Sequence, residues 1–151
     1  MARKYFDDFK VGQIRRSGPY PVSKEEIVRF AREFDPQPFH LDEAAARASV
    51  FGGLTASGAH IVALQLKLIH SKHSDENEAA VLAALGWDEV RFPNPVRPGD
   101  ELSLHSECIE TRVSKSKPDR GIVRTRNTVL NQNGEAVLTS INTILVKRGI
   151  D

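Results

Sequence analysis

A carboxylate and an imidazole stand five residues apart in the segment Asp35-Pro-Gln-Pro-Phe-His40. A residue before proline avoids the helical region, and Pro38 interrupts a regular helix, so this segment is predicted to be a turn. A glycine-rich stretch, Phe51–Gly58, follows and leads into a long apolar segment. A carboxylate and an imidazole can move protons to and from a water, and a helix N-terminus favours developing negative charge. The stretch therefore predicts a site that handles water next to a carbonyl group.

The same spacing has an ordinary structural explanation. Asp35 can belong to an Asp-Pro turn that ends one helix, and His40 can lie at the cap of the next. For an isolated aspartate and histidine at this spacing, the structural explanation is the more common one. The chemical interpretation therefore depends on the whole stretch and on the elements that position it.

A helix is predicted directly before the turn. Ser23 and Glu26 have the spacing of a capping box, in which each side chain bonds the other residue's backbone N–H. Apolar residues at helical spacing then predict one buried face, which consists of Ile27, Phe30, Ala31 and Phe34. Asp35-Pro36 ends this helix.

Two further helices and one strand complete the predicted first half. Asp42 can cap a short alanine-rich helix over residues 43–48. The segment from Gly58 to about His70 is apolar around most of its circumference, which predicts a helix buried inside the fold. A strand is expected over Val11–Arg16, with a chain break at Gly18-Pro-Tyr-Pro21. A polar loop is expected at 71–78.

Antiparallel strands dominate the predicted second half. They are expected over Trp87–Phe92, over the alternating segment Leu102–Cys108, and over Ile122–Leu130 and Ala136–Val146. Asn133-Gly134 is a strong signal for a hairpin between the last two, with a loop that can exceed two residues. Three prolines make 93–100 a rigid turn. Helices followed by antiparallel strands predict an α+β fold, with a buried helix on a curved sheet.

Composition excludes several classes of function. A chain of 151 residues can bury a core, and we expect one domain over residues 1–151. The net charge of +1 argues against a general binder of nucleic acid or anionic membranes. No apolar run approaches the roughly 20 residues of a membrane span. The polar start and the single cysteine, Cys108, predict a cytoplasmic protein.

The central stretch resembles a known family. Asp35-Pro-Gln-Pro-Phe-His40 is similar to the Asp-x-Asn-Pro-x-His motif of the MaoC-like dehydratases, in their R-specific enoyl-CoA hydratase branch. The glycine-rich segment 51–58 and the turn Pro95-Val-Arg-Pro-Gly-Asp100 add to the resemblance, which covers the chain from residue 23 to Val146. Two positions depart from the family pattern, with Gln37 in place of asparagine and Ser57 in place of histidine. The family implies a hot-dog fold, in which a bent antiparallel sheet wraps a long helix.

The resemblance also implies an activity and residues for it. Water adds to a trans-2-enoyl-CoA to give a (3R)-3-hydroxyacyl-CoA, or the reverse, with Asp35 and His40 holding the water. The family places the contact with the thioester oxygen at the backbone N–H of Gly58. Packing of small residues is the structural alternative for Gly58. Ser57 can cap the helix or touch the substrate, with capping the more usual role, and Gln37 can orient the loop or the water.

Basic residues are candidates for binding the phosphates of a coenzyme A or carrier-protein arm. They are Arg97, Lys115 and Lys117, with Arg124 and Arg126 beyond them. Charged loops are more often simply solvated, and this alternative stays open. The histidines lack acidic or cysteine partners at metal-ligand spacing, so no metal site and no cofactor are expected.

Two alternative functions and self-association of the chain are also considered. An acyl-CoA thioesterase on the same fold would direct water at the carbonyl with one carboxylate, for which a second acid or base is unnecessary. A non-catalytic subunit that binds acyl thioesters is the other alternative. The family commonly pairs into dimers, and a single bent sheet leaves an exposed edge that pairing would cover. We therefore expect a homodimer or a higher homo-oligomer.

Overall fold

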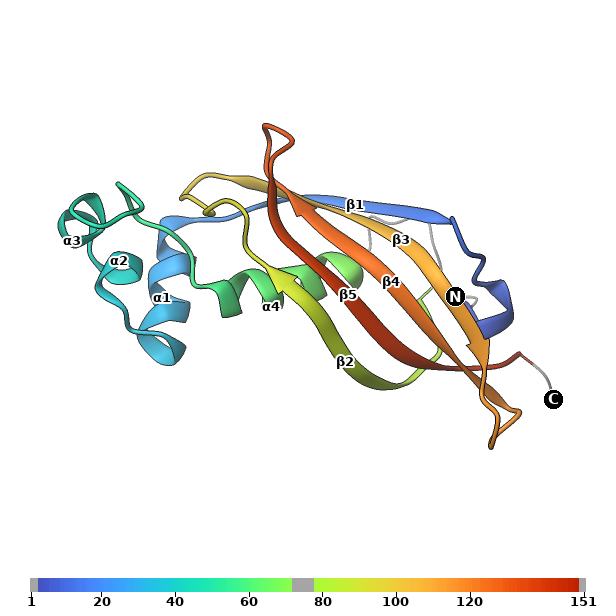
Figure 1. The fold of residues 1–151 in the computed structure, drawn as a ribbon. Helices are drawn as coiled ribbons and strands as arrows, with labels where there is room; N and C mark the ends of the chain where they lie inside the picture. Colours follow the sequence, from blue (N-terminus) through green and yellow to red (C-terminus); the bar gives the residue numbers. More distant parts are fainter. Residues whose placement is uncertain (1–2, 72–77, 150–151) are drawn as a thin grey trace.

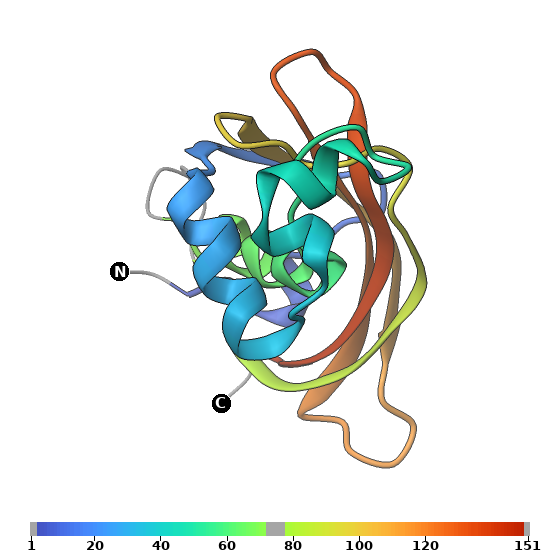
Figure 2. The same cartoon turned by 90° about the vertical axis from the view of Figure 1, so that its left-hand side faces the viewer.

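Five antiparallel strands form one bent sheet that curls around a central helix (Figures 1 and 2). The computed structural model describes residues 3–71 and 78–149. The strands are β1 (Ile14–Pro21), β2 (Val81–Arg91), β3 (Glu101–Val113), β4 (Arg120–Leu130) and β5 (Ala136–Lys147). Their order across the sheet is β1-β3-β4-β5-β2. This arrangement confirms the predicted α+β class with its curved antiparallel sheet.

The strands of the second half follow the sequence pattern closely. Leu102, Leu104 and Cys108 are buried on β3, as their alternation predicts. The predicted hairpin joins β4 to β5 through residues 131–135, where Asn131 Oδ1 accepts hydrogen bonds from the backbone N–H groups of Asn133 and Glu135. Local turn chemistry therefore fixes this connection. β2 begins at Val81, six residues before the predicted start.

The first strand was predicted only in part: residues 14–16 are in it, but its end and the expected chain break are wrong. β1 covers Ile14–Pro21 and passes through the segment expected to break the chain. It pairs with β3 alone and lies at the edge of the sheet, with a register shift between Ser17 and Tyr20. An edge strand tolerates proline because one side of its backbone needs no ladder partner. Gly18 has φ +105°, and a Cβ there would lie 2.7 Å from the carbonyl oxygen of Leu102.

Three helices, α1 (Lys24–Phe34), α2 (Pro38–Leu41) and α3 (Glu43–Arg47), lie at one end of the sheet (Figure 1). Ser23 accepts the hydrogen bond of Glu26 N–H and Asp42 that of Ala45 N–H, so both predicted N-caps form. Two expectations were wrong. Phe34 is exposed, because the chain turns away after it, and Pro38 starts a short helix as its first residue, where its missing N–H costs nothing.

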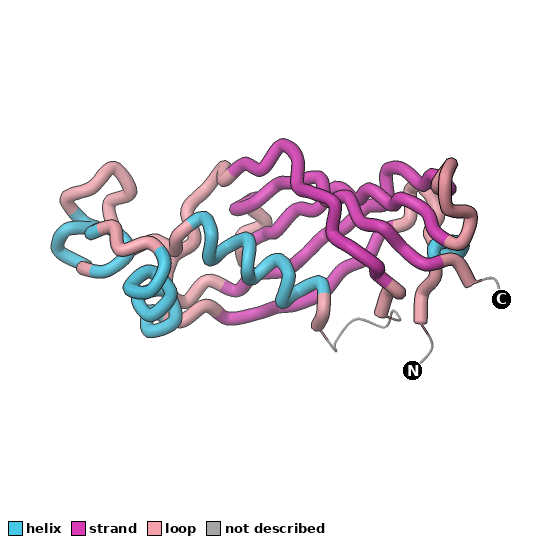
Figure 3. The backbone as a smooth tube through the Cα atoms, turned by 90° about the horizontal axis from the view of Figure 1, so that it is seen from below, coloured by secondary structure: helices cyan, strands magenta, loops and turns pink. Residues whose placement is uncertain are grey.

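The central helix, α4 (Gly58–Ile69), lies along the concave face of the sheet (Figure 3). Its sheet-facing side is buried through Ile61, Leu64, Gln65 and Leu68. The opposite side is not buried in the single chain, since Ala59, Ala63, Leu66 and Lys67 are exposed. The helix is therefore half covered rather than enclosed. The predicted polar loop falls mostly at residues 72–77, outside the described residues. No described helix has the length and apolar character to cross a membrane.

We expect the single thiol to be poorly reactive in the folded protein. Cys108 is buried, and burial raises its pKa above the ordinary value of a cysteine thiol. A raised pKa leaves less thiolate at mildly alkaline pH, and the thiolate is the reactive form. At pH 8, a disulfide reagent should react at least about tenfold more slowly with folded than with guanidinium-unfolded protein. Equal rates would show that Cys108 is not enclosed as described.

Candidate active site

Three segments of the chain meet where α4 begins. Asp35 is the residue at the C-cap of α1, and His40 lies on α2. Ser57 and Gly58 stand at the start of α4. Pro36 prevents α1 from continuing and Pro38 starts α2, so the chain reverses within a few residues and carries His40 back toward Asp35.

His40 is buried and held by the loop that precedes α4. Its Nδ1 lies within hydrogen-bond distance of the carbonyl oxygen of Thr55. A carbonyl oxygen only accepts, so Nδ1 must carry the hydrogen, and Nε2 is the atom directed at the site. His40 Nε2 lies 3.5 Å from Asp35 Oδ2. The Thr55 N–H in turn donates to the carbonyl of Phe39, which ties the loop to α2 at two points.

Asp35 is fixed by Ser57. The Ser57 hydroxyl donates a hydrogen bond of 2.7 Å to Asp35 Oδ2. The Ser57 side chain is buried, whereas that of Asp35 is 35% exposed, so the carboxylate stays accessible from one side. Ser57 occupies the N-cap position of α4, but its side chain makes no capping hydrogen bond. The expected capping role is therefore wrong: a capping hydroxyl accepts from a backbone N–H, whereas this hydroxyl is directed at Asp35 and donates to its carboxylate.

Gly58 is the first residue of α4. The first hydrogen bond of this helix runs from Ile61 N–H to Ser57 O, so earlier N–H groups have no partner within the helix. These groups lie at the positive end of the helix dipole. A Cβ at position 58 would lie 2.9 Å from the ring of Phe92. Close packing against Phe92 thus explains the glycine as well, and both explanations apply to the same position.

Arg97 and Gln37 lie near the site in different ways. The Arg97 guanidinium donates to the carbonyl oxygens of Phe51, Gly53 and Leu54. It therefore holds the glycine-rich loop that leads to Ser57, and its predicted contact with a phosphate stays a prediction. Gln37 is exposed and is the N-cap residue of α2, without a side-chain capping bond.

Lys115 and Lys117 lie far from the other predicted residues. Both are in the loop between β3 and β4, at the end of the sheet opposite α1–α3 (Figure 1). β3 has 13 residues and connects the two ends. At about 3.3 Å per residue, the lysines are some 40 Å along the strand from its start. The structure does not bring them to Asp35 and His40 of the same chain, because the hairpin that carries them extends away from the site.

Several features of this site carry no signal in the sequence. The carbonyl of Thr55 is a backbone group, and the bond between Ser57 and Asp35 joins residues 22 positions apart. The sequence identified Ser57 as the residue before Gly58, but its hydrogen bond to Asp35 could not be derived from spacing. Within residues 3–71 and 78–149, no three histidine, cysteine, aspartate or glutamate side chains are grouped so as to hold a metal ion.

Comparison with known proteins assigns the family. Residues 9–131 match the family model described as the MaoC like domain. The chain belongs to the MaoC-like domain family. The crystal structure of the MaoC-like dehydratase from Rhodospirillum rubrum is 40% identical to this MaoC-like chain, with a TM-score of 0.89, and the match covers 98% and 99% of the two chains. The uncharacterized protein YdeM of Bacillus subtilis is 32% identical over 144 residues, 94% of this chain and 98% of YdeM.

Two similar proteins have names that state an activity. Mesaconyl-CoA hydratase from Cereibacter sphaeroides is 29% identical over 148 residues, and the match spans 97% of the MaoC-like chain but 42% of that enzyme. The unliganded R-hydratase PhaJ1 from Pseudomonas aeruginosa is 27% identical with a TM-score of 0.75, covering 95% and 86% of the two chains. A Mycobacterium tuberculosis protein described as a double hot-dog fold has a TM-score of 0.75 at 21% identity, over 99% of this chain and 46% of that one, which supports the fold alone. The predicted hot-dog fold is confirmed.

We expect Arg97→Met to destabilise the protein by about 1–3 kcal/mol, because it leaves the loop carbonyls without their donor. Thermal unfolding of the variant would measure this cost as a lower Tm. Arg91→Met is the matched control, since Arg91 is exposed and donates to the carbonyl of its neighbour Val90. Equal Tm values for the two variants would contradict a structural role of Arg97.

Proposed function

We propose that this protein is a hydratase that adds water to a trans-2-enoyl-CoA to give a (3R)-3-hydroxyacyl-CoA, or catalyses the reverse dehydration. The observation that carries the proposal is the pair His40 Nε2 and Asp35 Oδ2, 3.5 Å apart, with each side chain held by a further hydrogen bond, His40 by Thr55 and Asp35 by Ser57. Thr55 sets the tautomer of the imidazole, and Ser57 sets the position of the carboxylate. Both groups therefore direct proton-accepting or proton-donating atoms toward one point.

In the proposed reaction, one water molecule bridges this pair. A separation of 3.5 Å is long for a direct hydrogen bond, but one water can lie about 2.8 Å from both atoms. In hydration, one group of the pair takes a proton from this water while its oxygen bonds to C3 of the enoyl thioester. The electron pair of the double bond moves onto the thioester oxygen as an enolate. A proton held by the pair then goes to C2, which restores the carbonyl and leaves the pair ready for another cycle.

The N-terminus of α4 supplies the complementary charge. The enolate oxygen carries negative charge, and the N–H of Gly58 lies at the positive end of the helix dipole. One backbone donor aimed at such an oxygen is typically worth about 10²–10³ in rate. Ser57 and Gly58 are consecutive, so the same turn of the helix holds the Asp35 carboxylate and carries the N–H that binds the enolate oxygen. The site thus combines proton transfer with charge stabilisation, without a cofactor.

The names of similar proteins support this reaction class. The mesaconyl-CoA hydratase supports a CoA thioester as the substrate class, and the R-hydratase supports the (3R) product. Asp35 and His40 match the family motif residue by residue, and Gly58 matches the family's oxyanion position. A thioesterase would need no second acid or base, and a non-catalytic subunit would need neither side chain fixed in this way.

Asp35→Asn and His40→Ala should each lower the hydration rate of crotonyl-CoA by at least about 10², since each removes a proton-transfer group. Ser57→Ala should lower it by about tenfold, because the carboxylate loses one charge-assisted hydrogen bond. Loss of enoyl absorbance and release of free thiol would be followed in the same run, with melting temperatures alongside. Glu25→Gln on the exposed side of α1 is the control and should stay active.

Other outcomes of this assay would point to other functions. Release of thiol would indicate a thioesterase. Binding of longer or branched enoyl-CoA thioesters without any turnover would indicate a non-catalytic subunit. Chiral analysis of the product would test the configuration, and a (3S) product would contradict that part of the proposal.

We also propose that the protein works as a homodimer that pairs through β2. β2 is an edge strand, bonded only to β5, and it exposes large apolar side chains. These are Val81, Leu82, Leu85 and Trp87, with Phe92 directly after the strand. An edge strand with unpaired backbone groups and exposed apolar side chains tends to pair with another strand, and β2 of a second copy can pair with it.

Light scattering after gel filtration should give about twice the chain mass of 16.8 kDa for the wild type. Leu85→Lys should shift the protein toward monomer, because pairing would desolvate the added charge. Val113→Lys is the matched control, since Val113 is also exposed, at 42% against 52% for Leu85, but lies at the end of β3. A wild type that stays monomeric at tens of micromolar, or a dimer indifferent to Leu85→Lys, would contradict this arrangement.

The proposed compartment is the cytoplasm. Cys108 is free and buried, which suits a reducing environment. A CoA thioester substrate is consistent with the same compartment.

A further inference from the structure

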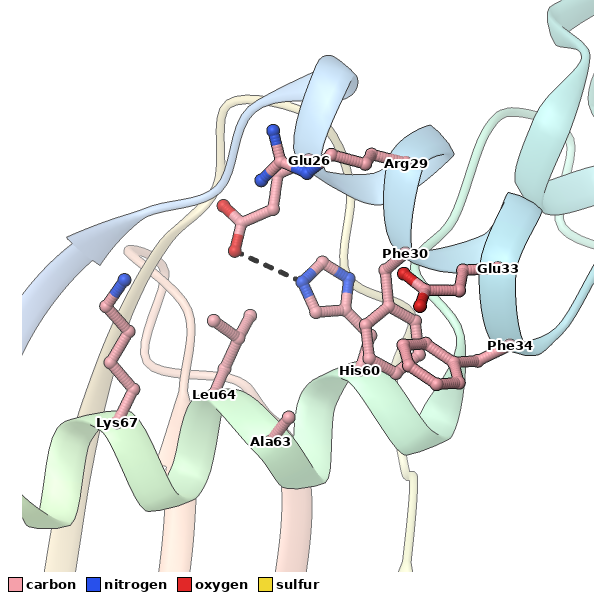
Figure 4. Close-up of a pocket in the computed structure, with 9 residues that line it drawn as sticks. All are labelled: Glu26, Arg29, Phe30, Glu33, Phe34, His60, Ala63, Leu64 and Lys67. Carbon is pink, nitrogen blue, oxygen red and sulfur yellow. Dashed lines mark hydrogen bonds and ion pairs between the residues drawn. The ribbon is translucent and has the colours of Figure 1, made fainter.

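A buried polar contact joins α1 to α4 away from the proposed reacting groups. His60 Nε2 lies 3.2 Å from Glu26 Oε1, and the His60 side chain is almost fully buried (Figure 4). His60 Nδ1 has no hydrogen-bond partner within the described part of the chain. A carboxylate oxygen only accepts, so His60 Nε2 carries a hydrogen in this contact. His60 therefore donates one directed hydrogen bond to Glu26.

The Glu26 carboxylate is itself fixed by β1. The Tyr20 hydroxyl lies 3.1 Å and 3.0 Å from its two oxygens, and Lys67 Nζ lies 3.3 Å from the same hydroxyl. This use of the carboxylate explains why the predicted capping box is only half formed. Ser23 accepts the bond of Glu26 N–H, but the Glu26 side chain turns toward His60 instead of back to Ser23.

His60 also contacts the next turn of α1. Its ring stacks on Phe30 with centroids 4.7 Å apart and planes inclined by 10° (Figure 4). Glu26 and Phe30 are four residues apart, so they share one face of α1. A single side chain thus restrains α1 both along its axis and in rotation about it.

The same turn of α4 restrains the other end of α1. Ser57 and His60 are three residues apart at the start of α4. Ser57 bonds to Asp35 at the C-terminal end of α1, and His60 holds Glu26 near the N-terminal end. The two contacts together fix the carboxylate of Asp35 relative to the N–H of Gly58. In the proposed reaction, the carboxylate acts at C3 of the enoyl thioester and the N–H acts at the thioester oxygen, yet the two groups come from different helices.

We propose that Glu26 and His60 are positioning residues for the hydration reaction, a role that rests on the proposed function. Neither residue contacts the reacting atoms; they act by setting the distance between Asp35 and Gly58. A displacement of about 1 Å between reacting groups can cost 10²-fold in rate. A buried pair of polar groups contributes little net stability compared with a well-packed apolar pair. The His60–Glu26 contact therefore serves to orient α1 relative to α4 and contributes little to stability.

The first test is steady-state kinetics on an enoyl-CoA that the wild type hydrates. Glu26→Ala and His60→Phe should each lower kcat by about tenfold with KM changed by less than about threefold, because orientation and not binding is lost. Glu26→Gln should recover most of kcat, since its amide oxygen accepts from both Tyr20 and His60. The double variant should be no slower than the slower single variant.

The matched control is Glu33→Gln. Glu33 is a second glutamate of α1 that lines a pocket between α1 and α4 together with Glu26 and His60 (Figure 4). None of the hydrogen bonds or ion pairs among the described residues involves Glu33. Its kcat should equal that of the wild type. The proposal would be overturned if Glu26→Ala and His60→Phe were fully folded at the assay temperature and kept the wild-type kcat, even if their melting temperatures were lower.

A second readout does not depend on turnover. Nuclear magnetic resonance signals of the His40 ring nitrogens, identified with His40→Gln, report how Asp35 faces the imidazole. Glu26→Ala should move these signals toward those of Asp35→Asn, and Glu33→Gln should leave them at the wild-type positions. Unmoved signals in Glu26→Ala would overturn the positioning role. A wild type without hydratase activity would instead refute the proposed function, and the His40 signals would then decide the positioning role alone.

Discussion

The hydrogen bond between the His40 imidazole and the carbonyl of Thr55 is the constraint on which the site depends. It places the hydrogen on Nδ1, so that Nε2 faces Asp35. The carbonyl can do this only if its loop is rigid. Arg97 binds three carbonyls of residues 51–54, and Ala56 N–H donates to the carbonyl of Val96. The orientation of the His40 imidazole thus depends on the proline-containing turn that carries it and on Arg97, which lie outside the Asp35–His40 pair.

The second half of the site is organised by the first turn of α4. Ser57 holds the carboxylate, Gly58 provides a backbone donor, and His60 holds α1. In the proposed reaction, this one turn therefore determines where groups from α1 and from the substrate stand relative to one another. In that reaction the proton-transfer groups come from α1 and α2 and the charge-stabilising group from α4, and the start of α4 holds the Asp35 carboxylate beside the Gly58 N–H. The sheet contributes by supporting the buried side of α4.

The residues that could be predicted from the sequence are those whose partners are close along the chain. Ser23 and Asp42 were identified as caps because a cap bonds three residues ahead, and Asp35 and His40 because a short motif contains both. Contacts between distant residues could not be derived in this way. A serine before a helix predicts a cap, but the carboxylate of Asp35, 22 residues away, takes its hydroxyl instead.

Charge was the least informative property for locating the site. Arg97, Lys115 and Lys117 were equal candidates for binding phosphate, yet one clamps a loop and two lie at the far end of the sheet. The direction in which a hairpin extends depends on the whole sheet and not on the basic residues in its loop. Likewise, the prolines of β1 signal a break, and only the edge position of that strand makes them compatible with pairing.

In the proposed reaction, Asp35 and His40 hold one water against C3 of an enoyl thioester whose oxygen is bound by Gly58. A crystal structure of Asp35→Asn with a bound trans-2-enoyl-CoA would test this arrangement directly, because the variant should bind the substrate without converting it. We expect the thioester oxygen within hydrogen-bond distance of the Gly58 N–H, and a water on His40 Nε2 facing C3. An enoyl group bound elsewhere, or one whose carbonyl carbon and not C3 faces His40, would contradict it.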